Sequence, residues 1–356
     1  MSGGIDSSIA AVLLHEQGYE VVGMTMKTWD YASSGGGKKE TGCCSLDSIN
    51  DARQIAVALG FPHYILDIRE EFGEKVIENF TSEYLDGRTP NPCVLCNTHM
   101  KWDSLLRRAQ MLGCEYIATG HYAKLGNANG RYFISRGYDE GKDQSYALWG
   151  VSQASLAKTI FPLADLTKPQ VRDISRAHGY VELIAKSESY EICFIPDNDY
   201  RSFLKHRVPE LETSVAGGQF VLTDGTVVGT HEGYPFYTVG QRKGLGVALG
   251  YPVYVTEIQK DANRVVLGPI EKMFKSGLKV GRLNFLKYEG IPDGGMDCTV
   301  KIRYSDQGHM ARVVQEGDFL QIRFHEPVFG IAPGQAAVLY EGDDVVGGGW
   351  IMTSYL

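Results

Sequence analysis

The chain has 356 residues, 43% of them hydrophobic and 22% charged, and this length favours two or three domains over a single core. No apolar run approaches the roughly 18 residues that span a bilayer, and the first residues form no leader, so we expect a cytoplasmic protein with no membrane partner. The net charge of −8 excludes a uniformly basic surface but not a nucleic-acid partner, because such binding depends on a local patch. Seven cysteines, an odd number, favour reduced thiols, metal ligands or redox chemistry over a disulfide scaffold.

Residues 1–205 alternate between helix-like and strand-like segments. Apolar positions at helical spacing predict helices, and short apolar runs between them predict buried strands. The predicted helices cover residues 7–18, 48–60 and 70–87, and the predicted strands cover 19–29, 61–68 and 114–123. This alternation is typical of a parallel sheet covered by helices, so we expect an α/β, doubly wound first domain.

The pattern changes after about residue 205, where short alternating runs bounded by glycines replace the helical periods. Turn signals such as Thr-Asp-Gly and Glu-Gly-Asp recur through this part, as they do in small barrels. We therefore predict three domains: an α/β catalytic domain at 1–205, a small β-rich domain at 206–275 and a C-terminal β-barrel at 276–356. The glycine- and serine-rich stretch at 33–40 is expected to be a mobile loop.

The segment SGGIDSS, residues 2–8, opens the first predicted helix. Its paired glycines allow backbone N–H groups to approach a ligand closely, and the helix N-terminus directs its dipole at an anion. The segment lacks the lysine of a Walker A loop, so a nucleotide would be held mainly by backbone amides and hydroxyls. A plain capped helix start is the alternative, but the place of the segment ahead of a β–α–β pattern favours a phosphate site.

A second motif, GRTPNPCVLCN at 87–97, contains two cysteines spaced C-x-x-C behind two prolines that stiffen the chain. This spacing suits the edge of a metal or cluster site, or an activated thiol. The segment YEICFIP supplies Cys193 as a third candidate, whereas a structural zinc site would need a fourth soft ligand. We expect Cys114 to be an inert thiol inside an apolar strand, and we expect loop or core positions for Cys43, Cys44 and Cys298.

The segment SGGIDSS resembles the PP-loop of the ATP pyrophosphatases, which activate a carbonyl oxygen by adenylation and release pyrophosphate. Ten segments in order narrow the resemblance to the bacterial tRNA-specific 2-thiouridylases: SGGIDSS, GCCSLDSINDAR, TPNPCVLCN, ATGHYA, KDQSYALWG, FPLADLTKPQVRDI, EICFIP, YTVGQRKGLG, KIRY and APGQAAVLYEGDDVVGGG. They run the length of the chain. Any one of them could arise by chance, whereas ten in the right order could not.

The resemblance implies an enzyme, an ATP-dependent tRNA-uridine 2-sulfurtransferase. Such enzymes replace the C2 oxygen of the wobble uridine with sulfur in tRNAs for Lys, Glu and Gln. The C2 oxygen would attack the α-phosphate of ATP, with Mg²⁺ present, and pyrophosphate and then AMP would leave. The implied ATP-binding residues are Met1, Ser2, Gly3, Gly4, Ile5, Asp6, Ser7, Ser8, Met26 and Gly120.

Two cysteines are implied to carry the sulfur chemistry. Cys193 would bear a persulfide received from a donor protein, and Cys96 would be the partner thiol. Either the terminal sulfur attacks C2, or Cys96 attacks Cys193 to free hydrosulfide, and a Cys96–Cys193 disulfide remains for a reductant to reopen. In the alternative route Cys93, Cys96 and Cys193 hold three irons of a [4Fe–4S] cluster and leave one iron open for sulfide. Family members with an aspartate at the position of Cys93 could use it as an acid or base, which a thiol does less readily. We favour the persulfide route without a metal, in which Cys93 is a neighbour of the target base.

Contacts with tRNA follow from the same resemblance. Asn91, Pro92 and Cys93 would line the pocket for the uridine, which must be flipped out of the anticodon stack to be reached. The implied tRNA-binding residues are His121, Lys142, Asp143, Gln144, Arg303, Tyr304 and Gln335, and Arg242 and Lys243 fit a phosphate clamp on a glycine-rich loop. Each basic residue has a plain alternative as a solvated surface charge.

Two other functions compete with this interpretation. Another PP-loop enzyme would need no cysteine pair if it were an amidotransferase-type synthetase, or would carry an extra N-terminal RNA-binding domain if it were a 4-thiouridine synthetase. A zinc-stabilised RNA-binding module would use the three cysteines and a histidine such as His99, but it gives no reason for ten ordered segments.

Relatives carry a strand and a glycine just before the position of Met1, so we also expect the native chain to start several residues upstream and the shorter form to bind ATP poorly.

Overall fold

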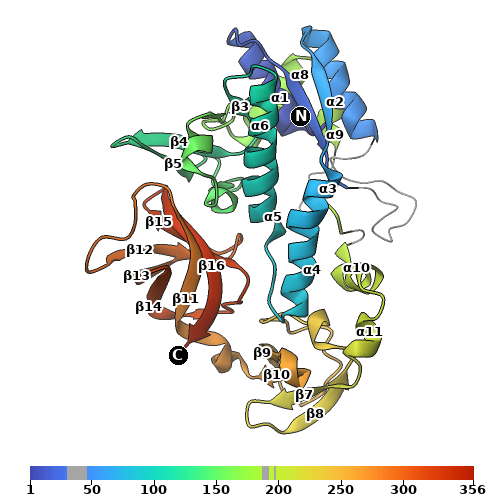
Figure 1. Ribbon diagram of the computed structural model, residues 1–356, viewed down its shortest axis with the longest axis vertical. Coiled ribbons are helices and arrows are strands. Elements are labelled where there is room, and N and C mark those ends of the chain that lie inside the picture. The colour runs from blue at the N-terminus through green and yellow to red at the C-terminus, as the bar shows by residue number, and fades with distance from the viewer. Residues whose placement is uncertain (30–45, 187–191, 196–197) are drawn as a thin grey trace. The chain divides into compact units, whose positions relative to one another are not determined.

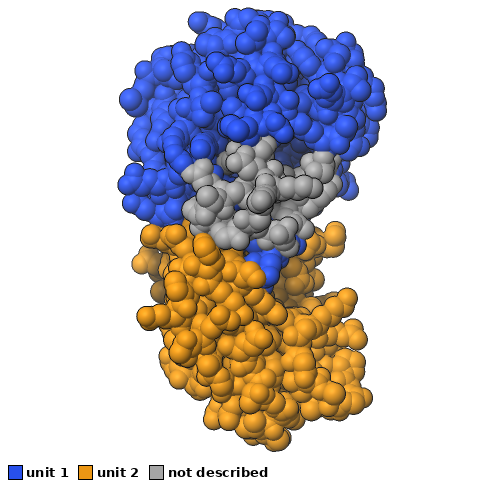
Figure 2. Space-filling model, turned by 90° about the vertical axis from the view of Figure 1, so that its right-hand side faces the viewer, with its two compact units in different colours: residues 1–76, 93–200, 343–345 blue, residues 77–92, 201–342, 346–356 orange. Residues whose placement is uncertain are grey.

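The computed structural model describes residues 1–29, 46–186, 192–195 and 198–356. These residues form two compact units, which Figure 2 colours separately. Unit 1 comprises Met1–Val76, Cys93–Tyr200 and Asp343–Val345, and unit 2 comprises Ile77–Pro92, Arg201–Gly342 and Val346–Leu356. The 33–40 stretch, Cys43 and Cys44 lie outside the described residues. Among helices in the described ranges, none combines the length and apolarity needed to cross a membrane.

Unit 1 contains two pairs of parallel strands, and Figure 1 shows the helices around them. β1 (Gly23–Lys27) pairs in parallel with β2 (His63–Asp67), and β3 (Ile117–Ala118) pairs in parallel with β6 (Thr159–Ile160). Parallel neighbours need a crossover connection, and α2 (Leu46–Leu59) supplies it between β1 and β2 while packing against both strands. The predicted α/β class is confirmed.

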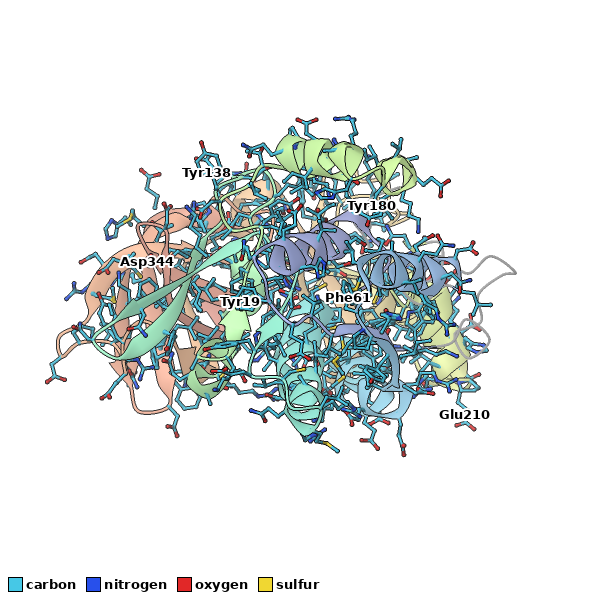
Figure 3. The ribbon with its side chains drawn as sticks, turned by 90° about the horizontal axis from the view of Figure 1, so that it is seen from above. Tyr19, Phe61, Tyr138, Tyr180, Glu210 and Asp344 are labelled. Carbon is cyan, nitrogen blue, oxygen red and sulfur yellow. The ribbon has the colours of Figure 1, made fainter. Side chains whose placement is uncertain are left out.

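α1 (Ile5–Glu16) buries most of its apolar residues within unit 1. It packs against α8 (Lys168–Ala177), with Ile5 and Ile9 in one core cluster with Val171. α8 begins with a complete capping box between Thr167 and Gln170, which satisfies two backbone N–H groups that a helix start leaves unpaired. Tyr180, labelled in Figure 3, packs on the same cluster just before α9 (Val181–Ala185). The segment SGGIDSS therefore leads into a well-packed helix.

One continuous helical run carries the C-x-x-C motif (Figure 1). α5 (Pro92–Leu95), a π-helix at Cys96–Ser104 and α6 (Leu105–Met111) follow one another without a break. The π-helix buries Trp102, whose indole N–H donates to the hydroxyl of Thr159 at 2.8 Å. π-turns are rare and often occur at functional sites.

The helix predicted at 70–87 is divided into α3 (Arg69–Phe72), a π-helix at Gly73–Ile77 and α4 (Glu78–Leu85). Glu71 of α3 accepts a hydrogen bond from Arg108 of α6 at 2.8 Å and another from the Ser104 hydroxyl. These donors stabilise the carboxylate, Arg108 most, and lower the pKa of Glu71 to about 2. The ion pair fixes α3 to the helical run that carries Cys96.

The remaining elements of unit 1 are short. β4 (Ala123–Ala128) and β5 (Arg131–Arg136) form an antiparallel hairpin, and β5 pairs with Asp344, which is labelled in Figure 3. α7 (Gln153–Leu156) follows the hairpin in the chain. The prediction that Cys114 is buried in a strand is wrong: Gly113 turns the chain with φ = +80°, β3 begins only at Ile117, and Cys114 is half-buried in the connection.

Unit 2 contains a four-stranded sheet in the order β8-β7-β10-β9. Two helices precede it, α10 (Tyr200–Arg207) and α11 (Leu211–Ser214), and its strands are β7 (Gly218–Leu222), β8 (Val227–His231), β9 (Tyr254–Gln259) and β10 (Arg264–Gly268). β7 and β10 are parallel neighbours, whereas the other pairs are antiparallel.

The last part of unit 2 is a closed antiparallel barrel. Its pairing order β11-β14-β13-β12-β15-β16 returns to β11, so the barrel has no open edge. Cys298 lies in its core between apolar residues, as predicted. The strands are β11 (Phe274–Phe285), β12 (Met296–Lys301), β13 (His309–Glu316), β14 (Phe319–Phe329), β15 (Ala336–Glu341) and β16 (Asp344–Tyr355).

Candidate functional site

The segment SGGIDSS forms a tight turn that leads into α1. Gly3 has φ = +68°, and a Cβ atom on it would lie 2.1 Å from the carbonyl oxygen of Ser48, so only glycine fits there. Within the described residues no side chain caps the helix start at Gly4. The first N–H groups of a helix have no intrahelical partner, so this helix start is suited to an anion. Ser7 braces the turn: its hydroxyl accepts from Ser2 N at 3.0 Å and donates to Gly4 O at 3.2 Å.

Two further observations at this turn fit a phosphate-bearing ligand. Ser8 is fully buried, and its hydroxyl has no hydrogen-bond partner among the residues that the structure describes. Gly120 lies directly against the turn, because a Cβ atom on it would be 2.6 Å from the carbonyl carbon of Asp6 and 2.7 Å from Ser7 N. Only a residue without a side chain leaves that space open. The structure thus places Gly120 against residues 2–8, the two parts of the chain that the family resemblance assigns to ATP.

Met1 and Met26, also predicted to bind the nucleotide, are both associated with β1. Met26 is a residue of that strand and lies opposite Leu66 of β2. The carbonyl oxygen of Met1 accepts a hydrogen bond from the Thr25 hydroxyl at 2.5 Å. The predicted residues therefore converge on the end of α1 and the neighbouring strand.

A buried lysine pairs with the aspartate of the turn. Nζ of Lys168 lies 2.7 and 2.8 Å from the two carboxylate oxygens of Asp6, and the Tyr122 hydroxyl donates to the same carboxylate at 2.7 Å. Lys168 is only 4% exposed, and its backbone N–H donates to Asp139 at 2.8 Å. The pair fastens the turn at residues 2–8, which we call the phosphate turn, to the start of α8. Sequence reasoning missed this role, although the segment FPLADLTKPQVRDI contains the lysine.

Lys186 is a second cation at the turn that sequence reasoning missed. Its Nζ donates to Gly3 O at 3.3 Å and pairs with the carboxylate of Asp51 on α2. Burial lowers the pKa of Lys186, and the charge of Asp47 opposes that change. Two lysines from distant segments thus hold the turn at residues 2–8 through ion pairs with Asp6 and Asp51.

The three candidate cysteines lie in two segments of unit 1. Cys93 and Cys193 are exposed, and Cys96 is half-buried at the first position of the π-helix. Although Cys93 keeps solvent contact, the protein atoms around it raise the pKa of its thiol, and Lys101 opposes this rise. Phe194, next to Cys193, is buried edge-on against Phe72 of α3 with ring centroids 5.6 Å apart, which anchors the exposed thiol.

No metal-binding cluster is present among the described residues, where three or more His, Cys, Asp or Glu side chains are nowhere grouped closely enough. Cys93, Cys96 and Cys193 all belong to the described ranges, so they are not gathered as a ready cluster site. His99, the candidate fourth ligand of a zinc site, instead lies 3.0 Å from the Asp103 carboxylate.

His121 is buried beside the π-helix. Burial lowers the pKa of His121 well below its usual value, and Lys101 lowers it further. Lys101 Nζ lies 3.2 Å from Nε2, and an ammonium can only donate, so Nε2 accepts and Nδ1–H donates to the Thr119 hydroxyl at 2.7 Å. The ring therefore orients Lys101, in a position with little surface for RNA.

The other residues predicted to contact tRNA lie in both units. Asp143 accepts hydrogen bonds from Gly137 N and Ser145 N, each at 3.1 Å, and Gln144 accepts from Tyr122 N at 3.1 Å, so both side chains hold the local backbone. Lys142 is half-buried beside them. In unit 2, Arg303 is half-buried and donates to Phe329 O at 3.3 Å, and Tyr304, Arg242 and Lys243 are exposed.

Gln335 contacts the segment that leads to the C-x-x-C motif. Its side-chain nitrogen donates to Pro90 O at 2.8 Å and to Thr89 O at 3.3 Å, and Thr89 N donates to Pro333 O at 2.8 Å. Asn91 and Pro92, predicted to line the target-base pocket, come directly after these carbonyls. Gln335 therefore holds the segment that leads to Asn91 and Pro92.

The fold and the phosphate turn define an α/β nucleotide-binding domain followed by two β domains. The family model described as "tRNA methyl transferase HUP domain" matches residues 1–197, the "tRNA methyl transferase PRC-barrel domain" matches 201–269, and the "Aminomethyltransferase beta-barrel domain" matches 275–351.

Three relatives illustrate the likeness, each called tRNA-specific 2-thiouridylase MnmA. The protein of Amoebophilus asiaticus is 69% identical over 100% of this chain and 94% of its own length, and that of Cytophaga hutchinsonii is 66% identical over 100% and 96%. The protein of Carboxydothermus hydrogenoformans is 49% identical over 99% and 96%. The chain belongs to the family of tRNA-specific 2-thiouridylases.

Proposed function

We propose that this protein is a tRNA-uridine 2-sulfurtransferase that uses ATP to thiolate the wobble uridine of tRNAs for Lys, Glu and Gln. The observation that supports it most is the phosphate turn at the start of α1, with Gly3 and Gly120 packed against backbone, in a chain whose relatives are named 2-thiouridylases. We further propose that the catalytic domain ends near residue 205 and the central β-rich domain near 275.

The reaction begins with activation of the base. The C2 oxygen of uridine attacks the α-phosphorus of ATP, a new P–O bond forms, and pyrophosphate leaves. The amides at the start of α1 and the buried hydroxyl of Ser8 are suited to hold the phosphates, while the ion pairs of Lys168 and Lys186 keep the turn in place. Mg²⁺ would be held mainly by the phosphates themselves. Activation turns a poor leaving oxygen into AMP.

Sulfur then replaces that oxygen. The terminal sulfur of a persulfide on Cys193, supplied by a donor protein, attacks C2, and the C–O bond breaks to release AMP. The Cys96 thiolate attacks Sγ of Cys193, the S–S bond breaks, and its sulfur stays on the uridine. The resulting Cys96–Cys193 disulfide takes two electrons from a thiol reductant. Asn91, Pro92 and Cys93 would line the flipped uridine, and His121, Lys142, Asp143, Gln144, Arg303, Tyr304 and Gln335 are proposed to bind the tRNA.

Cysteine variants test this chemistry. Cys96→Ala and Cys193→Ala should each abolish 2-thiouridine formation in the presence of ATP, a persulfide donor and reductant, while tRNA-dependent pyrophosphate release continues. Cys114→Ala is the matched control, because Cys114 is half-buried like Cys96 but lies outside the motif, and it should retain activity. Thiolation by either Cys96→Ala or Cys193→Ala would refute the persulfide roles.

Anaerobic purification distinguishes the persulfide route from the cluster route. An active preparation without iron or labile sulfide supports the persulfide route. Stoichiometric iron that is required for activity, and that is lost in Cys93→Ser, would instead assign Cys93, Cys96 and Cys193 to a [4Fe–4S] cluster.

A further inference from the structure

The segment at residues 85–92 is held from outside by both β domains of unit 2. Tyr234 of the central domain donates its hydroxyl to Leu85 O at 2.6 Å, and Lys260 pairs with Asp86 at 2.6 Å. From the barrel, Pro333 and Gln335 contact Thr89 and Pro90 as described above.

The sequence of the segment explains why outside contacts are necessary. Pro90 and Pro92 have no N–H group, so they cannot donate the backbone hydrogen bonds that hold an ordinary turn. Pro90 is buried, and its carbonyl needs a donor to offset the loss of water. Gln335 supplies that donor from the start of the 336–341 strand, where the Gln335 carbonyl accepts from Ile351 N at 2.8 Å and ties the residue to the barrel wall.

The barrel loop that contains Gly334 also lies close against the backbone of residues 85–92. Gly334 has φ = +90°, and a Cβ atom on it would lie 2.7 Å from Thr89 O and 3.0 Å from Glu83 Oε2. Glu83, 8% exposed, accepts two hydrogen bonds from Arg88, at 2.6 and 3.0 Å, which fixes the chain just before Thr89. A side chain at 334 would push the segment away, so glycine there serves close approach of two backbones.

We propose that Gln335, with Gly334, is a positioning residue that sets the place of Asn91 and Pro92, so that the C-terminal barrel controls presentation of the target base. This inference rests on the proposed function, in which those residues line the uridine pocket. It gives Gln335 a role in the rate of the reaction beyond any contact with tRNA. It also gives a role to Gly334, which has no side chain with which to recognise RNA.

Kinetic constants of two variants separate positioning from RNA contact. Gln335→Glu keeps the shape of the side chain, but it replaces the N–H donor that faces the carbonyl oxygens of Thr89 and Pro90 with an acceptor. Its single-turnover thiolation rate at saturating tRNA should fall roughly tenfold, the cost of about two neutral hydrogen bonds, and adding more tRNA should not restore this rate. Gly334→Ala should reproduce this defect. Gln315→Ala, which removes bonds to another loop of the same barrel, and Gly317→Ala, which has φ = +60° in open space, are the matched controls and should behave as wild type.

Hydrogen exchange supplies a readout independent of activity. The Thr89 amide, which donates to Pro333 O, should exchange faster in Gln335→Glu and Gly334→Ala than in wild type or in the two control variants. A raised tRNA Kd with an unchanged saturating rate would overturn the proposal in favour of a plain RNA contact, and unchanged rate and exchange would also overturn it. If the wild type makes no 2-thiouridine, the proposed function fails, while the exchange measurement still decides whether Gln335 holds the segment.

Discussion

The Lys168–Asp6 pair gives a quantitative prediction. Lys168→Met removes the cation that donates to the Asp6 carboxylate. Of the two side chains described above as its donors, only the Tyr122 hydroxyl is then left. Breaking a buried ion pair by removing one partner costs about 3–5 kcal/mol. The Lys168 side chain is 5% exposed but that of Asp6 is 34% exposed, so solvent screens part of the charge. We therefore expect the free energy of unfolding to fall by about 2–3 kcal/mol. The Michaelis constant for ATP should rise, because an uncompensated carboxylate then lies at the phosphate turn.

Denaturant unfolding of a double-mutant cycle checks this reasoning. In Asp6→Asn/Lys168→Met both charges are gone, so the double variant should be more stable than Lys168→Met alone. Lys124→Met is the control: Lys124 pairs with Asp165 at 3.0 Å, but the two side chains are 39% and 82% exposed, and its loss should cost less than about 1 kcal/mol. The reasoning is refuted if the double variant is no more stable than Lys168→Met, or if the control loses as much.

Three further predictions concern titration. The folded-state pKa of Glu71 is about 2, below the ordinary 4.5, so its pairing with Arg108 stabilises the fold above about pH 4.5. That contribution is lost as the pH falls towards 2. Glu71→Gln should therefore flatten this part of the stability–pH profile. Burial lowers the pKa of His231 from 6.5 to about 4, so the unfolded chain takes up the proton first and stability should fall between pH 6.5 and 4, a slope that His231→Gln removes in thermal unfolding. Lys101→Met should raise the pKa of the Cys93 thiol, measured as a shift to higher pH of its alkylation in peptide mass spectrometry; an unchanged profile would show that Lys101 does not act on it.

Much of the fold could be predicted because local patterns of apolar residues determine its helices and strands. The apolar spacing of α1 and α2 and the short apolar runs of β1 and β2 encode elements that tertiary contacts leave intact. The glycine-bounded alternation after residue 205 likewise predicts β domains. Cys114 was misplaced because an apolar run cannot by itself say where a strand begins, and the strand there has only the residues Ile117–Ala118.

The turn at residues 2–8 could be predicted from the sequence, whereas the contacts that support it could not. Paired glycines and serines are a local signature, so residues 2–8 could be identified from the sequence, and Gly120 came from the resemblance. The partner of Asp6 lies 162 positions away, and Gln335 lies 245 positions from Pro90. Such partners are set by how helices and strands pack, and no period in the sequence encodes them. Contacts of this kind explain why residues with an expected RNA role also hold the backbone.

The π-helix at Cys96–Ser104 affects how the surface around the C-x-x-C motif should be mapped. In a π-helix each hydrogen bond links residues that are five positions apart. Cys96 and Lys101 are therefore separated by about one turn and lie on the same side of the helix. A helical wheel drawn at 3.6 residues per turn would put the two on different sides and would rotate every later position as well. Cross-linkers or engineered cysteines placed on this helix by ordinary α-helical periodicity would therefore face the wrong direction, and deleting a single residue from it would turn Leu105–Met111 relative to the thiol.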